Sequence, residues 1–141
     1  MSVEEIAVAQ WPKPKGYANG MRGVGAPIHI AGQIGWNAQG QFDALTLVDQ
    51  FAVALDNVLA VVVAAGGSAT DIARLTVYVT DITAYRDAGR ALSEVWRPRM
   101  GRHFPAMALV AVTALVERQA LVEIEATAYV LDSCDTHAVE P

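Results

Sequence analysis

The sequence has little charge, one cysteine and no long uninterrupted apolar run. Charged residues make up 18% of the 141 residues, whereas about 25% is usual in a soluble domain. The lone thiol of Cys134 excludes an internal disulfide framework and favours a reducing compartment, so we expect a cytoplasmic protein. The most apolar stretch, residues 51–65, contains Asp56 and Asn57 and is shorter than the ~20 residues of a membrane span. It predicts a buried helix, and we expect no membrane partner.

Basic residues are also scarce, because 10 lysines and arginines face 15 acidic residues and the formal net charge is −5. Nucleic-acid binding needs a basic surface that neutralises several phosphates, so RNA or DNA is not the expected partner. Glu4 and Glu5 stand where a secretory signal would be basic, which predicts no export signal. The histidines at 29, 103 and 137 lack metal-ligand spacing, and no glycine-rich phosphate loop is present. We therefore expect neither a metal nor a cofactor.

What the sequence has in excess is apolar side chains, at 53% of the residues. A chain of this length predicts one domain over residues 1–141 with its own core. Proline and glycine near the start predict an extended N-terminal arm over residues 1–15, and residues 131–141 form a polar C-terminal tail. The apolar surplus indicates either burial in an oligomer or an exposed binding patch.

The spacing of apolar residues predicts an α+β fold with two helices packed on one face of a sheet. One helix is expected over residues 44–65, because apolar residues recur three and four positions apart and two glycines follow. A second is expected over residues 84–96, ended by Pro98. Composition and alternation predict strands over residues 28–30, 75–80, 106–112 and 120–130.

The last predicted strand has two different faces. Val122, Ile124 and Ala126 point one way, whereas Glu123 and Tyr129 point the other, because side chains alternate along a strand. The small and branched residues suit packing against helices. The opposite face would leave apolar surface exposed in a monomer, so we infer that it packs against other copies of the chain.

Six short segments form a recognisable series along the chain. They are residues 15–20 (KGYANG), 28–34 (IHIAGQI), 54–58 (ALDNV) with the helix end at 64–66 (AAG), 76–81 (TVYVTD), 104–106 (FPA) and 121–126 (LVEIEA). No single segment is specific, but in this order they resemble the Rid family of reactive intermediate deaminases, also called the YjgF or endoribonuclease L-PSP family. The resemblance extends from about Gly16 to Val130.

The resemblance implies a chorismate-mutase-like α+β fold that assembles as a homotrimer around a central barrel, with ligand clefts between neighbouring subunits. It also implies an activity, the hydrolysis of enamines and imines such as 2-aminoacrylate to a keto acid and ammonia. In such members a tyrosine, a serine before Gly-Gln, an arginine after Pro-Ala and a glutamate on the last strand line the cleft.

This chain matches the family site only in part. Tyr17 and Glu123 stand at the tyrosine and glutamate positions, whereas Ala31, next to Gly32, replaces the serine and Met107 replaces the arginine. A guanidinium binds a carboxylate through two charge-assisted hydrogen bonds, which a thioether is unable to form. We therefore expect a substrate without an α-carboxylate, and an inefficient reaction with 2-aminoacrylate.

Three further residues are candidates for ligand binding. Trp36 follows the Gly-Gln segment, where it either narrows the cleft or fills a loop. Arg102 and His103 precede Met107, and we interpret them either as a solvated loop or as a compensating cation, with Arg99 or a neighbouring chain's Arg22 as alternatives.

Three functions follow in order of preference. The first is a small-molecule hydrolase or deaminase acting on C=N or enamine bonds, with Glu123 as its catalytic residue; the plainer interpretation of Glu123 is a polar side chain in a wet barrel. The second is a non-catalytic small-molecule-binding or regulatory trimer. A ribonuclease is the weakest, because the net charge of −5 offers RNA little to bind.

Overall fold

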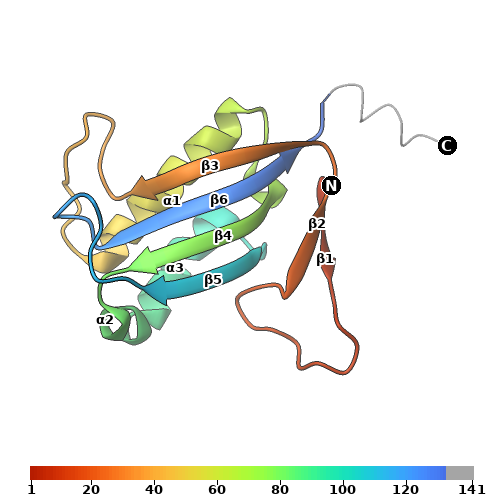
Figure 1. Cartoon of the computed structure of the whole chain (residues 1–141), viewed down its shortest axis with the longest axis horizontal. Helices are drawn as coiled ribbons and strands as arrows, with labels where there is room; N and C mark the ends of the chain where they lie inside the picture. Colours follow the sequence, from red (N-terminus) through yellow and green to blue (C-terminus); the bar gives the residue numbers. More distant parts are fainter. Residues whose placement is uncertain (133–141) are drawn as a thin grey trace.

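The chain folds into the α+β arrangement that its sequence predicts (Figure 1). The computed structural model describes residues 1–132, so most of the predicted tail over 131–141, including Cys134, lies outside the described residues. The elements in chain order are β1 (Val3–Ile6), β2 (Gly20–Gly23), β3 (Ala26–Ile34), α1 (Leu47–Ala64), the 3-10 turn η1 (Ala69–Asp71), β4 (Ile72–Val79), α2 (Ile82–Asp87), α3 (Gly89–Met100), β5 (Ala106–Ala111) and β6 (Val122–Val130).

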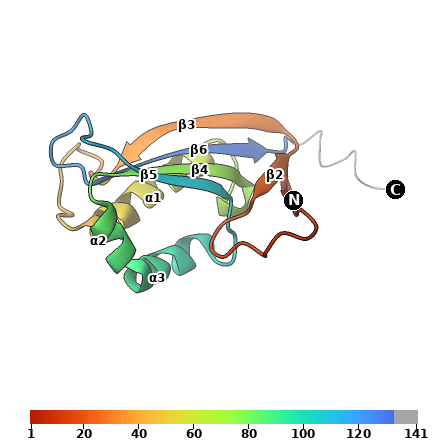
Figure 2. The same ribbon diagram turned by 60° about the horizontal axis from the view of Figure 1, so that its bottom comes forward.

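A four-stranded sheet in the order β3-β6-β4-β5 forms the centre of the fold. β6 pairs antiparallel with both β3 and β4, whereas β4 and β5 are parallel. A parallel pair needs a crossover connection, and α2 and α3 supply it. The helices lie on one side of the sheet, as Figure 2 shows, and no helix covers the other side within residues 1–132. We call that uncovered side the open face.

The hydrophobic core lies between the sheet and the helices. α1 begins after Thr46, whose hydroxyl accepts a hydrogen bond from the Asp49 N–H at 3.2 Å. The residues that α1 buries include Phe51, Leu55 and Val58. By length and composition alone α1 could cross a membrane, but here its apolar face packs against the sheet. The predicted helix over 44–65 is therefore confirmed as a core helix.

The second predicted helix, over residues 84–96, is in fact two helices, and the expectation that Pro98 ends it is wrong. Ala88 ends α2 and precedes α3 with φ −93° and ψ 10°. Pro98 lies inside the last turn of α3, where it lacks the N–H that would donate to the carbonyl of residue 94, yet the helix continues beyond it. The helix ends at Met100 instead, and Gly101 follows with φ +60°, a conformation that glycine adopts readily.

The N-terminal segment over residues 1–15 is tied to the domain more firmly than an extended arm would be. β1 pairs antiparallel with β2, and the Val24 N–H donates to the Ser2 carbonyl at 2.8 Å. The Ser2 hydroxyl also hydrogen-bonds the carboxylate of Asp71, the last residue of η1, directly before β4. β3 likewise extends beyond the predicted strand over 28–30, because its pairing with β6 resumes after a bulge.

A buried glutamine attaches the loop before β6 to α1. The side chain of Gln50 is 1% exposed. Its amide group donates to the carbonyls of Ala44 at 3.2 Å and Gln119 at 2.9 Å, and its oxygen accepts from the Leu121 N–H at 2.8 Å. One side chain thereby pairs three backbone groups and fixes where β6 begins.

Replacing Gln50 with leucine should keep the volume but leave those three backbone groups without partners. We expect Gln50→Leu to lower the free energy of unfolding by about 3 kcal/mol, since an unpaired buried polar group costs about 1–3 kcal/mol. Urea denaturation would measure the change. The control Gln39→Leu, at an exposed loop position, should change it by less than about 0.5 kcal/mol. Equal effects of the two variants would contradict the assignment.

Candidate functional site

The carboxylate of Glu123 lies on the open face against the backbone of β3. Gly32 makes this position possible, because a Cβ atom there would stand only 2.7 Å from Glu123 Cδ and 2.9 Å from its Oε1. Gly32 and Ala31 form the bulge between Ile30 and Gln33, and the Ala31 carbonyl accepts from Gln33 Nε2 at 3.1 Å. Within residues 1–132 no hydrogen bond or ion pair occupies the Glu123 carboxylate, so it is available to a ligand or water.

Glu125, one pleat further along β6, is already engaged. Its Oε1 accepts a hydrogen bond from the Tyr78 hydroxyl at 2.6 Å. That hydrogen bond raises the pKa of Tyr78 above its usual value of 10.0, and desolvation and the nearby carboxylates add to the effect. A depression of about 240 Å³ next to the pair is lined by His29, Arg74 and Thr76. Glu125 is therefore a structural partner of Tyr78, whereas Glu123 is not held.

Met107 lies on the opposite side of the sheet from Glu123. In the parallel pairing of β4 with β5, Met107 is opposite Leu75, which is fully buried. Met107 accordingly packs at the edge of the core beneath the helices. Residues paired across neighbouring strands share a face of the sheet. Tyr78 is paired with both Glu123 and Val110, so all three side chains lie on the open face. Within one chain, the sheet therefore separates Glu123 from Met107.

Tyr17 and Met107, by contrast, line the same cleft. A cavity of about 370 Å³ is bordered by both, with Lys15, Tyr85 and Leu109. The Tyr17 side chain is 44% exposed, whereas burial raises the pKa of Tyr85. The cleft is therefore mainly apolar and carries two phenol groups. We call it the Met107 cleft.

Arg102 and His103 lie near Tyr17 but apart from Met107. They line a second cavity of about 410 Å³ together with Tyr17 and Lys13, and Met107 does not border that cavity. His103 Nε2 is 2.7 Å from the Ile72 carbonyl oxygen, and because a carbonyl only accepts, Nε2 carries the hydrogen. The ring is thus anchored to β4, and the exposed Arg102 is the more adaptable cation of the two.

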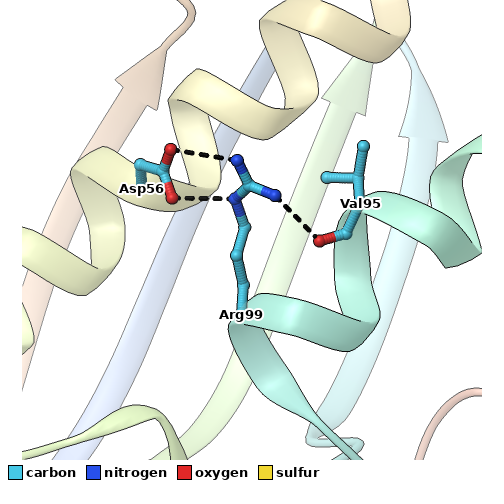
Figure 3. A network of polar contacts seen from close by, with 3 residues as sticks. All are labelled: Asp56, Val95 and Arg99. Atoms are coloured by element: carbon cyan, nitrogen blue, oxygen red, sulfur yellow. Dashed lines mark hydrogen bonds and ion pairs between the residues drawn. The ribbon is translucent and has the colours of Figure 1, made fainter.

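Arg99 is occupied elsewhere and does not reach the cleft as a replacement cation. Its Nε and Nη2 donate to the two Asp56 oxygens at 2.8 and 3.2 Å, and Nη1 donates to the Val95 carbonyl at 3.0 Å (Figure 3). This two-point ion pair joins α3 to α1. The suggestion that Arg99 compensates for Met107 therefore finds no support in the structure.

Trp36 belongs to a loop that the described cavities do not reach. Its ring centre is 6.1 Å from that of Phe42, and its carbonyl accepts from Asn57 Nδ2 at 3.1 Å. The same Asn57 amide also donates to the Ile34 carbonyl at 3.0 Å. Of the two interpretations offered by the sequence, this contact pattern favours a packed loop residue within one chain.

Comparison with known proteins identifies the family. The model of the family described as endoribonuclease L-PSP matches residues 10–130. A RutC family protein of Pyrococcus horikoshii is 34% identical over 128 residues, which cover 89% of this chain and 97% of the relative. The chain belongs to the endoribonuclease L-PSP family, also called the Rid or YjgF family.

Solved structures of Rid proteins share the whole fold. YyfB of Yersinia pestis, a Rid protein of unknown function, superimposes with a TM-score of 0.81 at 29% identity, covering 92% of this chain and 100% of that one. TdcF of Escherichia coli, solved with bound serine, gives a TM-score of 0.66 at 30% identity, covering 90% and 98%. This Rid chain therefore has the chorismate-mutase-like α+β fold that its sequence predicts.

Sequence reasoning missed two residues of the Rid chain that the structure places near the candidate site. Tyr78 could have been found, because it alternates with the buried Val77 and Val79 along a predicted strand. Tyr85 gave no such signal, since a single helix over 84–96 does not indicate which way a residue of the separate α2 points. Among residues 1–132 no group of three or more histidine, cysteine, aspartate or glutamate residues could hold a metal ion.

The Tyr78–Glu125 hydrogen bond predicts how stability depends on pH. Because the folded-state pKa of Tyr78 is raised above 10.0, the folded protein keeps this proton where the unfolded chain loses it. Its contribution is complete below pH 10.0 and is lost as the pH rises through the folded-state pKa. We expect the urea midpoint to fall above pH ~10, and to fall less steeply in both Tyr78→Phe and Glu125→Gln. Wild-type slopes in both variants would contradict this.

Proposed function

We propose that this Rid-family chain hydrolyses imines or enamines in clefts between protomers of a homotrimer. The observation that carries the proposal is the separation of Glu123, on the open face, from Tyr17 and Met107 on the helix side. A site that uses all three needs the open face of one protomer beside the Met107 cleft of another. TdcF, a relative 32% identical over 108 residues, carries a reactive intermediate deaminase name.

The open face supports assembly. It carries no covering helix within residues 1–132, and the sequence has more apolar side chains than one small core requires. Val110 at the edge strand β5 is 45% exposed on this face. Assembly around a three-fold axis would bury this surface, because a cyclic trimer joins one patch of each subunit to a different patch of its neighbour.

The chemistry assigned to the site is water addition to a C=N bond. The Glu123 carboxylate accepts a proton from a water molecule as the water oxygen attacks the imine carbon. The proton then passes to the substrate nitrogen and gives a carbinolamine. Transfer of the hydroxyl proton of the carbinolamine to the same nitrogen lets the C–N bond break and the C=O bond form, and a carbonyl compound and ammonia leave. The Tyr17 hydroxyl donates a hydrogen bond to the substrate at the mouth of the cleft. No metal or cofactor takes part in this scheme.

The substrate class follows from what the site lacks. Met107 and Ala31 offer no cation or hydroxyl for a carboxylate, and a charge-assisted hydrogen bond contributes about 1.5–3 kcal/mol. The structure of TdcF contains serine, an amino acid. We propose instead that this chain prefers neutral imines and is inefficient with 2-aminoacrylate. A cytoplasmic location agrees with the single cysteine.

A non-catalytic binding or regulatory trimer is the second candidate. The replacement of the family arginine by Met107 and of the serine by Ala31 favours it, because a cleft can keep its ligand after losing groups that orient a reaction. Ligand-dependent melting without turnover would identify such a protein. RNA remains an unfavourable partner at a net charge of −5.

Glu123→Gln tests the catalytic assignment. We expect ammonia release from a panel of freshly generated imines and enamines to fall about 100-fold or more, because a general base contributes about 100- to 10,000-fold. Glu125→Gln is the matched control, since it lies on the same strand face and can still accept from Tyr78. Unchanged turnover in Glu123→Gln, or equal losses in both variants, would contradict the role of Glu123.

The homotrimer predicts a sedimenting mass about three times the 15.0 kDa of one chain. Val110→Asp should lower that mass, because association would bury an unpaired charge on the open face. Val116→Asp, at a loop residue that is 98% exposed, should leave it unchanged. A monomer in the wild type, or a trimer that tolerates Val110→Asp, would overturn this use of the open face.

A further inference from the structure

Beside the Met107 cleft lies a second apolar cavity of about 260 Å³. The two cavities share Gly16, Tyr85 and Met107, so they adjoin each other at the edge of the core. The second cavity is lined mainly by large apolar and aromatic side chains, and we call it the aromatic pocket. Its lining residues from the helices and neighbouring segments include Phe51, Tyr85, Leu92, Trp96, Phe104 and Met107.

The walls of the aromatic pocket are preformed. The rings of Trp96 and Phe104 stack with centres 5.7 Å apart and planes only 2° from parallel. Phe51 and Leu92, from α1 and α3, are 3% and 7% exposed and belong to the hydrophobic core. Rings held by such packing need little reordering when a flat apolar group enters, which favours binding.

The polar groups of the pocket are neutral in its wall and charged only at its rim. Trp96 is 8% exposed, and its buried Nε1–H has no hydrogen-bond partner within residues 1–132. Burial raises the pKa of the Tyr85 phenol, so this hydroxyl is neutral at physiological pH. The one cation of the lining, Arg86 on α2, is exposed.

We propose that the aromatic pocket binds an aryl group, and hence that the ligand is a neutral aryl imine or aryl ketone whose C=N or C=O group lies beside Met107. This inference rests on the proposed function and deepens it, because it names the class of substrate. A carboxylate at the same point would lose its water to a thioether and aromatic carbon, without a buried cation to pair with it.

Arg86 does not replace the missing cation. An exposed arginine that reaches across solvent forms ion pairs that contribute little, and Lys15, the cation that lines the Met107 cleft, is exposed as well. If Arg86 did bind a carboxylate, the preference for neutral ligands would be lost, so the experiment below includes this possibility.

Two commercially available probes differ only in whether they carry a carboxylate. Acetophenone carries a methyl group where phenylglyoxylate carries a carboxylate, and both have the same phenyl ring and carbonyl. Calorimetric titration of the full chain should give a Kd for acetophenone that is lower by about tenfold or more than that for phenylglyoxylate. Equal affinities, or tighter binding of phenylglyoxylate, would overturn the proposal. If phenylglyoxylate binds tighter than acetophenone in the wild type and the two affinities become equal in Arg86→Ala, the carboxylate binds Arg86 and the proposal is overturned.

Gly89 provides a way to close the pocket without disturbing the fold. It lines the pocket, and a Cβ atom there would meet nothing within 4 Å. We expect Gly89→Leu to weaken acetophenone binding about tenfold or more, because its side chain enters the space of the ring, while the melting temperature is kept. Gly89→Ala is the matched control and should bind nearly as the wild type does. Wild-type affinity in Gly89→Leu would overturn the location.

Met107 tests the ligand class at the junction of the two cavities. Met107→Arg should reverse the preference so that phenylglyoxylate binds tighter, whereas the neutral Met107→Leu should keep acetophenone ahead. Failure of both probes to bind would refute the aromatic pocket even if imine turnover were found. Binding of acetophenone without any imine turnover would refute the proposed reaction and leave the aromatic pocket standing.

Discussion

The alternation of side chains along β6 is the constraint on which the other features depend. Every second residue from Val122 to Ala128 is buried against the helices, and the residues between them face the open side. β6 is also the central partner, because it pairs with both β3 and β4. A shift of one residue would turn the core outward and move Glu123 into it. The position of the candidate catalytic group is thus set by the same burial that stabilises the sheet.

Polar side chains fix the positions of neighbouring elements relative to one another where hydrophobic packing alone does not specify them. The buried Gln50 fixes the loop before β6, and the Arg99–Asp56 pair fixes α3 against α1. His103 anchors the segment before β5 to the start of β4. Each of these contacts joins distant parts of the chain, and none of the residues that form them lines the Met107 cleft.

Much of the fold could be predicted from the sequence, because long amphipathic or alternating segments carry their own signal. α1 and β6 are examples, and the replacement of the family arginine by Met107 was visible from one short motif. The break at Ala88 was not, since the apolar spacing over 84–96 does not mark the residue at which α2 ends and α3 begins. The strand β1 was also missed, because four residues pair only when β2 is already in place.

The residues of the candidate site could be predicted from the sequence, but which of them lie together could not. Tyr17, Met107 and Glu123 were all named from the sequence, yet their distribution over two faces depends on strand register and pairing. Likewise, nothing local in the sequence links Phe51 with Phe104, which approach the same space from elements far apart in the chain. Cavities are properties of the packed domain, and a linear pattern does not contain them.

The contact between Gly32 and Glu123 has a consequence for how this chain can vary. Any side chain at position 32 would take the space that the carboxylate occupies, at an approach of 2.7 Å. A side chain at position 32 therefore requires the flexible end of Glu123 to turn away from β3. Residue 32 thus limits the directions in which the candidate base can point, although the two positions lie on different strands.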